Sequence, residues 1–235
     1  MFTFLYELDK DGVAVLTQAG HIVIYVLVAL SFVLIAALAS KKKMTAKELA
    51  FSAVAVTVAF LLSNVRLFRM PWGGSVTLLS MFFVTLVGYS FGAYVGFTAA
   101  FAYGLLQFVQ GGGSYMLSIW QVGFDYLFAF TALGASGLFK EKKNGLVMGY
   151  LVAVLFRGLF HSIGGYLYWM DYMPDNFPPS LAFAYPVLYN FAYIGAEAVI
   201  TLILIHLPPV KKALAAICNS FATPSSRGTT PPSTT

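Results

Sequence analysis

The chain alternates between long apolar runs and short polar segments. An apolar run of about 20 residues is long enough to cross a lipid bilayer as an α-helix. Read in windows of that length, the sequence predicts seven helices, over residues 13–39, 46–63, 76–90, 93–109, 115–138, 146–170 and 183–207. We therefore expect an all-α protein, built as a polytopic bundle of membrane-spanning helices.

Composition agrees with this class, because the chain has too few charges to cover a water-soluble globule. Hydrophobic residues make up 59% of the sequence and charged residues 10%, as is typical of a multi-pass protein whose surroundings are the lipid bilayer. Glu7, Asp9 and Asp11 precede the first run, which is longer than a signal-peptide core, so we expect a retained helix. The lone Cys218 excludes a disulfide framework.

Lysine and arginine are distributed unevenly between the two sets of connecting segments. With the N-terminus outside, the inner segments carry ten of these residues and the outer segments three, namely Lys10, Arg66 and Arg69. The positive-inside rule then places the C-terminus in the cytoplasm. This topology explains the net charge of +5, so no nucleic-acid partner is expected. Residues 223–235 are rich in Pro, Ser and Thr and are predicted to be disordered.

Polar side chains interrupt three of the apolar runs. Counted from the outer ends at about 1.5 Å per residue, Asp125 lies roughly 15 Å into its helix and His161 roughly 14 Å into the next. A charge at this depth costs on the order of a few kcal/mol and is a functional-site hypothesis by default. Other polar, aromatic or small residues of these runs join the candidate site: Gln121, Tyr126, Gly165, Trp169, Tyr185 and Asn190. Gly165 is expected to leave a gap between His161 and Trp169.

Two outer loops add aromatic side chains to this site. Trp72 lies between Pro71 and the pair Gly73 and Gly74, and Tyr115 follows a glycine-rich stretch, so both are placed on bends. Ring faces attract positive charge, and a carboxylate neutralises it. A pocket of this kind suits a ligand that is small, aromatic and cationic, with Trp72 as its lid.

Two further charges, Arg157 and Glu197, lie deeper, roughly 20 and 21 Å from the outer ends. We expect a buried ion pair beneath the site, because each alone would be uncompensated. No metal or cofactor is expected, since the histidines lie in separate helices without ligand spacing. The sequence contains no Gly-x-x-x-x-Gly-Lys-Ser/Thr phosphate loop, so we expect no ATP hydrolysis by that chemistry.

Two other functions fit the same residues. A proton-coupled secondary transporter would relay protons through Asp125 and His161, and its uptake would stop with uncouplers. The internal repeats common in such transporters are not visible in the sequence. An intramembrane enzyme would use the same pair as acid and base, and the purified protein would form product. A nucleophile with recognisable spacing is missing for this function.

Three segments carry most of the candidate residues: Gln121 to Phe130, His161 to Trp169, and Tyr185 to Asn190, with Gly134 to Gly137 after the first. They resemble the ligand-binding signatures of the ThiT family, the thiamine-specific S components of energy-coupling factor (ECF) transporters. The resemblance covers about residues 45–212. It implies a six-helix substrate-binding core over 45–212. We expect the remaining segments to be an extra N-terminal transmembrane helix with a basic cytoplasmic loop over 1–44 and a disordered cytoplasmic tail over 213–235.

The resemblance implies a high-affinity thiamine-binding subunit in a bacterial plasma membrane, which is not an enzyme. Uptake would need a separate energising module of two ATPase subunits and a transmembrane coupling subunit. The residues implied to contact thiamine are Asp125, His161, Trp169, Tyr185 and Asn190. Tyr115, Tyr126 and Gly165 match lining positions, and Trp72 matches a loop tryptophan that closes over the ligand. An S component for another small aromatic vitamin is the alternative.

The sequence departs from the family pattern in three places. The first helix has no counterpart in the six-helix core. Some members carry glutamate where Asp125 stands, so the shorter acid implies a shifted ligand or a water. The family docks its coupling subunit on an Ala-x-x-x-Ala stripe of the first core helix, and the nearest match here is Ala55 and Ala59.

Overall fold

Helices form the body of the protein. The computed structural model describes residues 6–8, 14–19, 22, 26, 43–111 and 117–221. The regular helices are α2 (Ala46–Ser63), α3 (Ser80–Phe91), α4 (Ala93–Gly111), α7 (Gly145–Tyr168), α8 (Tyr185–His206) and α9 (Pro208–Phe221). An irregular helix between α4 and α7 consists of α5 (Ile119–Val122), η2 (Gly123–Phe128), α6 (Ala129–Thr131) and η3 (Ala132–Phe139). Two short 3-10 helices, η4 (Met170–Tyr172) and η5 (Pro179–Ala184), connect α7 to α8.

The predicted all-α membrane bundle is confirmed. Four described helical stretches are long and apolar enough to cross a membrane: Ala46–Ser63, Trp120–Phe139, Gly145–Tyr168 and Pro179–His206. The predicted first helix, 13–39, lies mostly outside the described residues, as does Tyr115. Its start is wrong, because Ala14–Leu16 forms strand β2, which pairs antiparallel with β1 (Tyr6–Leu8).

The two ends of the bundle differ in what covers them. At one end, β3 (Arg66–Arg69) and β4 (Ser75–Thr77) form an antiparallel hairpin between α2 and α3. We call this the hairpin end. The helix predicted from residue 76 therefore starts only at Ser80, because residues 75–77 pair with β3 instead.

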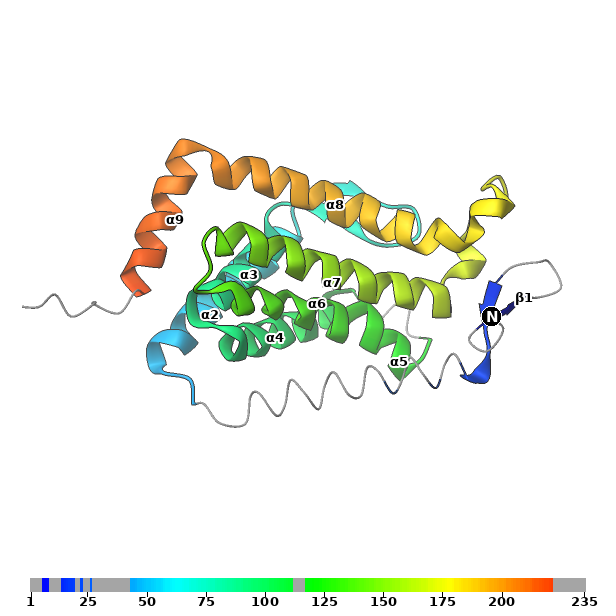
Figure 1. The fold of residues 1–235 in the computed structure, drawn as a ribbon, viewed down its shortest axis with the longest axis horizontal. Helices are drawn as coiled ribbons and strands as arrows, with labels where there is room; N and C mark the ends of the chain where they lie inside the picture. Colours follow the sequence, from blue (N-terminus) through cyan, green and yellow to red (C-terminus); the bar gives the residue numbers. More distant parts are fainter. Residues whose placement is uncertain are drawn as a thin grey trace, which may run out of the picture.

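At the other end, α9 turns back from α8 and lies across the bundle (Figure 1). The disordered tail expected from residue 213 is wrong as far as Phe221. Leu214 is buried, and Val210 and Cys218, one turn to either side, pack against the core. The Lys47 ammonium donates a hydrogen bond of 2.8 Å to the Ser220 carbonyl and so ties α9 to α2. We call this the α9 end.

Helix α2 starts at a capping box. Thr45 accepts a hydrogen bond from the Glu48 amide, and the Glu48 carboxylate accepts one from the Thr45 amide, so free N–H groups at both positions are satisfied. The helix buries Ala55 and Ala59 in the core. This pair, the nearest match to the family's docking stripe, therefore serves helix packing and leaves no exposed Ala-x-x-x-Ala surface on α2. Its exposed face carries larger residues, Leu49, Val54 and Leu61.

Glycines let η3 lie against α3 and α4 at backbone distance. A Cβ added at Gly134 would lie 2.5 Å from the Phe97 backbone of α4, and one at Gly88 of α3 would lie 2.9 Å from the Gly137 backbone nitrogen. Such close contacts are common between membrane helices, because lipid provides no hydrophobic drive and packing must supply the attraction. The resulting contacts fix the irregular helix, and with it η2, against the rest of the bundle.

Adding one methyl group at this contact should destabilise the protein. Gly134→Ala places a Cβ against the backbone of α4, and we expect a loss of about 1–3 kcal/mol in the free energy of unfolding. The measurement is thermal unfolding in detergent. Gly195→Ala is the matched control, because nothing lies within 4 Å of its Cβ position and alanine favours a helix by roughly 0.5–1 kcal/mol. Equal unfolding temperatures for wild type and Gly134→Ala would contradict this packing.

Candidate ligand-binding pocket

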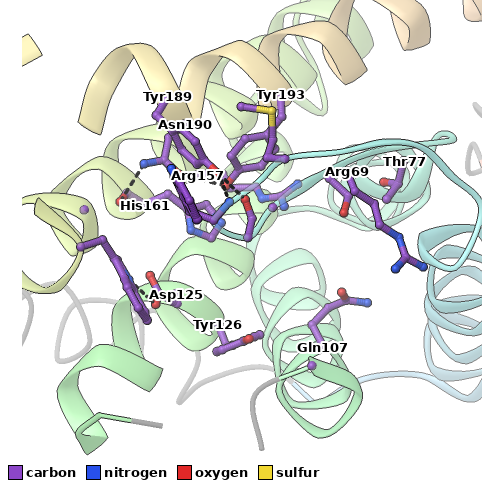
Figure 2. A pocket seen from close by; sticks show the side chains of 18 of the residues that line it. Arg69, Thr77, Gln107, Asp125, Tyr126, Arg157, His161, Tyr189, Asn190 and Tyr193 are labelled. Atoms are coloured by element: carbon purple, nitrogen blue, oxygen red, sulfur yellow. Dashed lines mark hydrogen bonds between the residues drawn. The ribbon is translucent and has the colours of Figure 1, made fainter. Parts of the chain in front are cut away.

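A single cavity at the hairpin end brings together the polar residues of the irregular helix, α7 and α8. Its volume is about 490 Å³, which is within the range of small-molecule sites. Figure 2 shows Asp125 and Tyr126 on one side and Tyr189, Asn190 and Tyr193 on the other, with Arg157 and His161 between them. All the described candidate residues line it: Trp72, Gln121, Asp125, Tyr126, His161, Gly165, Trp169, Tyr185 and Asn190.

Asp125 lies in a π-helical turn, η2. Such turns take up one extra residue, change the direction of the side chains around them and occur often at functional sites. Gly123 allows the turn, because a Cβ there would lie 2.9 Å from the Phe128 ring five residues on. The turn places Asp125 and Tyr126 beside each other on the cavity wall.

Two neighbours hold the Asp125 carboxylate in place. The Gln121 amide donates to Oδ2 at 2.6 Å, and the Trp169 indole donates to the same oxygen at 2.9 Å. Gln121 is itself 2% exposed and accepts a hydrogen bond from the Leu117 amide. Among the residues that the structure describes, none donates a hydrogen bond to Oδ1. The carboxylate is therefore fixed through one oxygen, and its other oxygen has no donor among the described residues.

The opposite wall is a polar contact between α7 and α8. The Asn190 side-chain amide donates to the carbonyls of Pro186, at 2.9 Å, and His161, at 3.3 Å. The Tyr193 hydroxyl donates to the Asn190 side-chain oxygen at 2.9 Å. The His161 ring packs edge-on to Phe130 and Tyr193, with centroids 6.0 and 6.3 Å away. Its Nε2 is buried and has no hydrogen-bond partner in the described chain.

Gly165 lines the cavity and also lies at the contact between α7 and α8. A Cβ at this position would lie 2.7 Å from the Pro186 Cβ and 3.4 Å from the Asn190 amide nitrogen. The missing side chain thus lets α8 approach α7. One residue earlier, a Cβ at Gly164 would lie 2.9 Å from Asp125 Oδ1, so this glycine makes room for the carboxylate.

Two rows of aromatic rings line the cavity and its mouth. Trp72, Tyr172 and Trp169 follow one another with centroid distances of 6.1 and 5.5 Å. On α8, three tyrosines spaced four residues apart form the second row, with centroids 5.7 and 6.3 Å apart: Tyr185, Tyr189 and Tyr193. Ring faces on both sides of a carboxylate are suited to a flat cation.

The hairpin is fixed to α8 at its tip. The Tyr189 hydroxyl accepts a hydrogen bond from the Trp72 amide and donates one to the Gly73 carbonyl, both at 2.9 Å. Gly74 has φ +82°, and a Cβ there would lie 2.8 Å from the Tyr193 ring. The hairpin therefore rests with its backbone directly on the second aromatic row. Trp72 itself remains 53% exposed, which is consistent with a residue at the edge of a lid.

Glu197 holds the base of the hairpin and the start of α3. Its carboxylate accepts hydrogen bonds from the Thr77 amide and hydroxyl at 3.1 and 2.6 Å, from the Ser80 hydroxyl at 3.0 Å and from the Met81 amide at 3.2 Å. Leu79, the residue before α3, offers no side-chain cap. A carboxylate from α8 thus caps the positive end of the α3 dipole.

The predicted ion pair between Arg157 and Glu197 is wrong. Both carboxylate oxygens of Glu197 are occupied by the hairpin and α3. Arg157 instead places its Cζ 4.4 Å from the centroid of the Phe130 ring and lines the cavity.

Several residues that line the cavity were not predicted from the sequence as site residues. The cavity also includes Tyr103, Gln107, Arg157, Tyr172, Tyr189 and Tyr193. The tyrosines of α8 could have been found, because they repeat every four residues from Tyr185 and so share one helix face. Tyr103 and Gln107 lie on α4, where nothing in the local sequence distinguishes a cavity wall from ordinary packing.

Removing the Tyr189 hydroxyl should loosen the hairpin tip. Tyr189→Phe deletes both hydrogen bonds to the tip but keeps the ring in its row. We expect faster amide hydrogen exchange over residues 70–75 and unchanged exchange in α3 and α4, because the bonds lost are local. Tyr94→Phe, on α4 outside the cavity lining, is the control. Wild-type exchange at the tip of Tyr189→Phe would show that this hydroxyl does not hold the hairpin.

Comparison with known proteins agrees with this fold and shows the family. A family model described as thiamine transporter protein matches residues 49–216. The thiamine transporter ThiT of Bacillus subtilis (strain 168) is 28% identical over 181 residues, covering 72% of this chain and 91% of that protein. A solved structure of ThiT from Listeria monocytogenes shares the fold, with a TM-score of 0.50 at 20% identity, covering 74% of this chain and 92% of that chain. Since the family model matches well over half of its residues, the chain belongs to the thiamine transporter protein family.

Proposed function

We propose that this membrane protein is the thiamine-binding S component of an ECF-type importer. The observation that carries the proposal is the cavity, in which a carboxylate with one free oxygen lies among aromatic rings under a hairpin. Thiamine joins a flat cationic thiazolium ring to a neutral aminopyrimidine ring. Both rings fit between aromatic side chains, and the cation fits a carboxylate.

Asp125 is the proposed partner of the thiazolium ring. Its Oδ2 is held by Gln121 and Trp169, which leaves Oδ1 to face the positive charge. Trp169, His161 and Tyr126 supply ring surfaces around the same region of the cavity. Asn190 and Tyr185 on α8 complete the opposite wall. Because the carboxylate is positioned before binding, the ligand does not have to bear the cost of ordering it.

The hairpin is the proposed lid. Trp72 lies at its tip, and Tyr189 holds the tip over the cavity through two hydrogen bonds. Closure of such a lid excludes water and strengthens the attraction between the acid and the cation. Opening requires loss of the tip contacts, while the Glu197 anchor at the base keeps the hairpin attached to the bundle.

The distribution of charge favours entry of thiamine from outside the cell. At the hairpin end, the described residues carry Arg66 and Arg69. The α9 end carries exposed lysines on the loops and helix ends: Lys43, Lys47, Lys140, Lys142, Lys143, Lys211 and Lys212. By the positive-inside rule the α9 end faces the cytoplasm and the cavity opens outward, in the plasma membrane of a bacterium.

Uptake is proposed to depend on a separate ATPase module. The sequence contains no phosphate-binding loop for ATP, and the proposed source of energy is a set of partner subunits, two ATPases and a transmembrane coupling protein. The apolar exposed face of α2 is the proposed contact for the coupling protein, with Leu49, Val54 and Leu61 at 60%, 63% and 62% exposure.

Neutralising Asp125 should weaken thiamine binding strongly. Asp125→Asn keeps an oxygen for the Trp169 indole but removes the charge that pairs with the thiazolium ring. We expect a loss of about 2 kcal/mol or more, on the order of 30-fold in Kd, by calorimetry of the detergent-purified protein. Asp175→Asn, an exposed position outside the cavity lining, is the matched control.

Selectivity is measured in the same experiment, with riboflavin and biotin as competitors that should not bind. Two results would argue against the proposal. The first is a wild-type protein that prefers another vitamin, and the second is an Asp125→Asn variant that binds thiamine as wild type does.

Transport should stop when the ATPase subunits are removed, while binding should persist. The measurement is accumulation of radiolabelled thiamine in cells that express this chain with and without the energising module. Accumulation that continues undiminished without the ATPases, and that uncouplers abolish, would indicate a proton-coupled secondary transporter instead.

A further inference from the structure

Arg157 is a buried cation on the inner wall of the cavity. It belongs to α7, one turn before His161, and is 7% exposed. Its Nε has no hydrogen-bond partner among the described residues, and its Cζ lies 4.4 Å from the centroid of the Phe130 ring. Figure 2 shows it near Asn190 and His161 on the cavity lining. Neither the sequence signatures nor the family assignment gives it a role.

Structural requirements do not explain this residue. A buried charge is costly unless its hydrogen bonds are made, and the nearby acid does not make them. Glu197 uses both carboxylate oxygens for the hairpin and α3. A methionine of similar length would pack on Phe130 without a desolvated charge. A buried arginine whose desolvation is not compensated by protein partners is typical of a functional site.

Two further polar groups near Arg157 also lack partners. The Tyr103 hydroxyl and His161 Nε2 are buried and have no hydrogen-bond partner in the described chain, and both residues line the cavity. The three groups come from α4 and α7. Asp125, on the irregular helix, presents a free carboxylate oxygen to the same cavity. The cavity thus has a positively charged wall on α4 and α7 and a negatively charged wall on the irregular helix.

We propose that Arg157 determines specificity by donating hydrogen bonds to the ring nitrogens of a neutral heteroaromatic ring. Its charge repels a cationic ring, so the two walls orient a ligand that has one ring of each kind. If the proposed function holds, the neutral ring is the aminopyrimidine of thiamine, whose two ring nitrogens are hydrogen-bond acceptors. The guanidinium offers five N–H donors in one plane, so one of them can be directed at a ring nitrogen that accepts in the plane of its ring.

The test compares thiamine with analogues in which one pyrimidine nitrogen is replaced by C–H. Calorimetry is done on the purified wild type, Arg157→Met and Arg157→Lys. Arg157→Met should bind thiamine about 10- to 100-fold more weakly, the range for a hydrogen bond to a charged group. Wild type should bind at least one analogue more weakly by a similar factor, and Arg157→Met should bind that analogue and thiamine equally. Arg157→Lys keeps the charge but loses the planar array, and should lose most of this discrimination.

Thermal unfolding without ligand separates this role from a structural one. If Arg157 serves a ligand, Arg157→Met should unfold at the wild-type temperature or above it, because a desolvated charge is removed. Lys140→Met makes the same change in net charge at the α9 end and is the control for both measurements. A clear fall in the unfolding temperature together with unchanged thiamine affinity would mark Arg157 as structural and overturn the proposal.

The outcomes for the two proposals are distinct. A wild type that does not bind thiamine overturns the proposed function, and the role of Arg157 with it. If wild type binds thiamine normally, the role of Arg157 alone is overturned by one result. That result is an Arg157→Met or Arg157→Lys variant that discriminates thiamine from every analogue as wild type does.

Discussion

A charged side chain inside an apolar helical bundle must find its hydrogen-bond partners in the protein or in a ligand, because lipid offers none. The buried charges of this protein meet this constraint in different ways. Glu197 is fully satisfied by four donors from the hairpin and α3. Asp125 is satisfied through one oxygen. Arg157 has no partner for Nε in the described chain. The first charge therefore organises the structure, and the other two face the cavity.

The irregular helix between α4 and α7 positions the charged side chain of Asp125 on the cavity lining. Its 3-10 portion packs on α3 and α4 through glycines at backbone distance, and its π-helical turn directs Asp125 toward α7. Gly164 and Gly165 let the carboxylate and α8 approach α7. Small residues thus set the distances between helices, and those distances place the carboxylate within reach of the Trp169 indole. The hairpin then covers the cavity, fixed at its base by Glu197 and at its tip by Tyr189.

Much of this arrangement could be predicted from the sequence, because apolar run length and charge placement are local signals. The core helices were expected within about four residues of their observed bounds, and the described candidate residues share one cavity. The wrong predictions concern residues whose partners lie far away in the sequence. Glu197 was expected beside Arg157, but the hairpin and the α3 terminus offer it four neutral donors. Residues 213–221 were assigned to the same disordered tail as the Pro-, Ser- and Thr-rich residues 223–235, yet Leu214 and Cys218 pack on other helices.

Thiamine is proposed to bind in one cavity, with its cationic ring at Asp125. This cavity lies between the irregular helix, α7, α8 and the hairpin. A crystal structure of the purified protein with thiamine tests this most directly. The account predicts ligand density under Trp72, with the thiazolium ring next to Asp125 and the aminopyrimidine ring next to Arg157. Density for thiamine outside this cavity, or with the two rings exchanged, would contradict it.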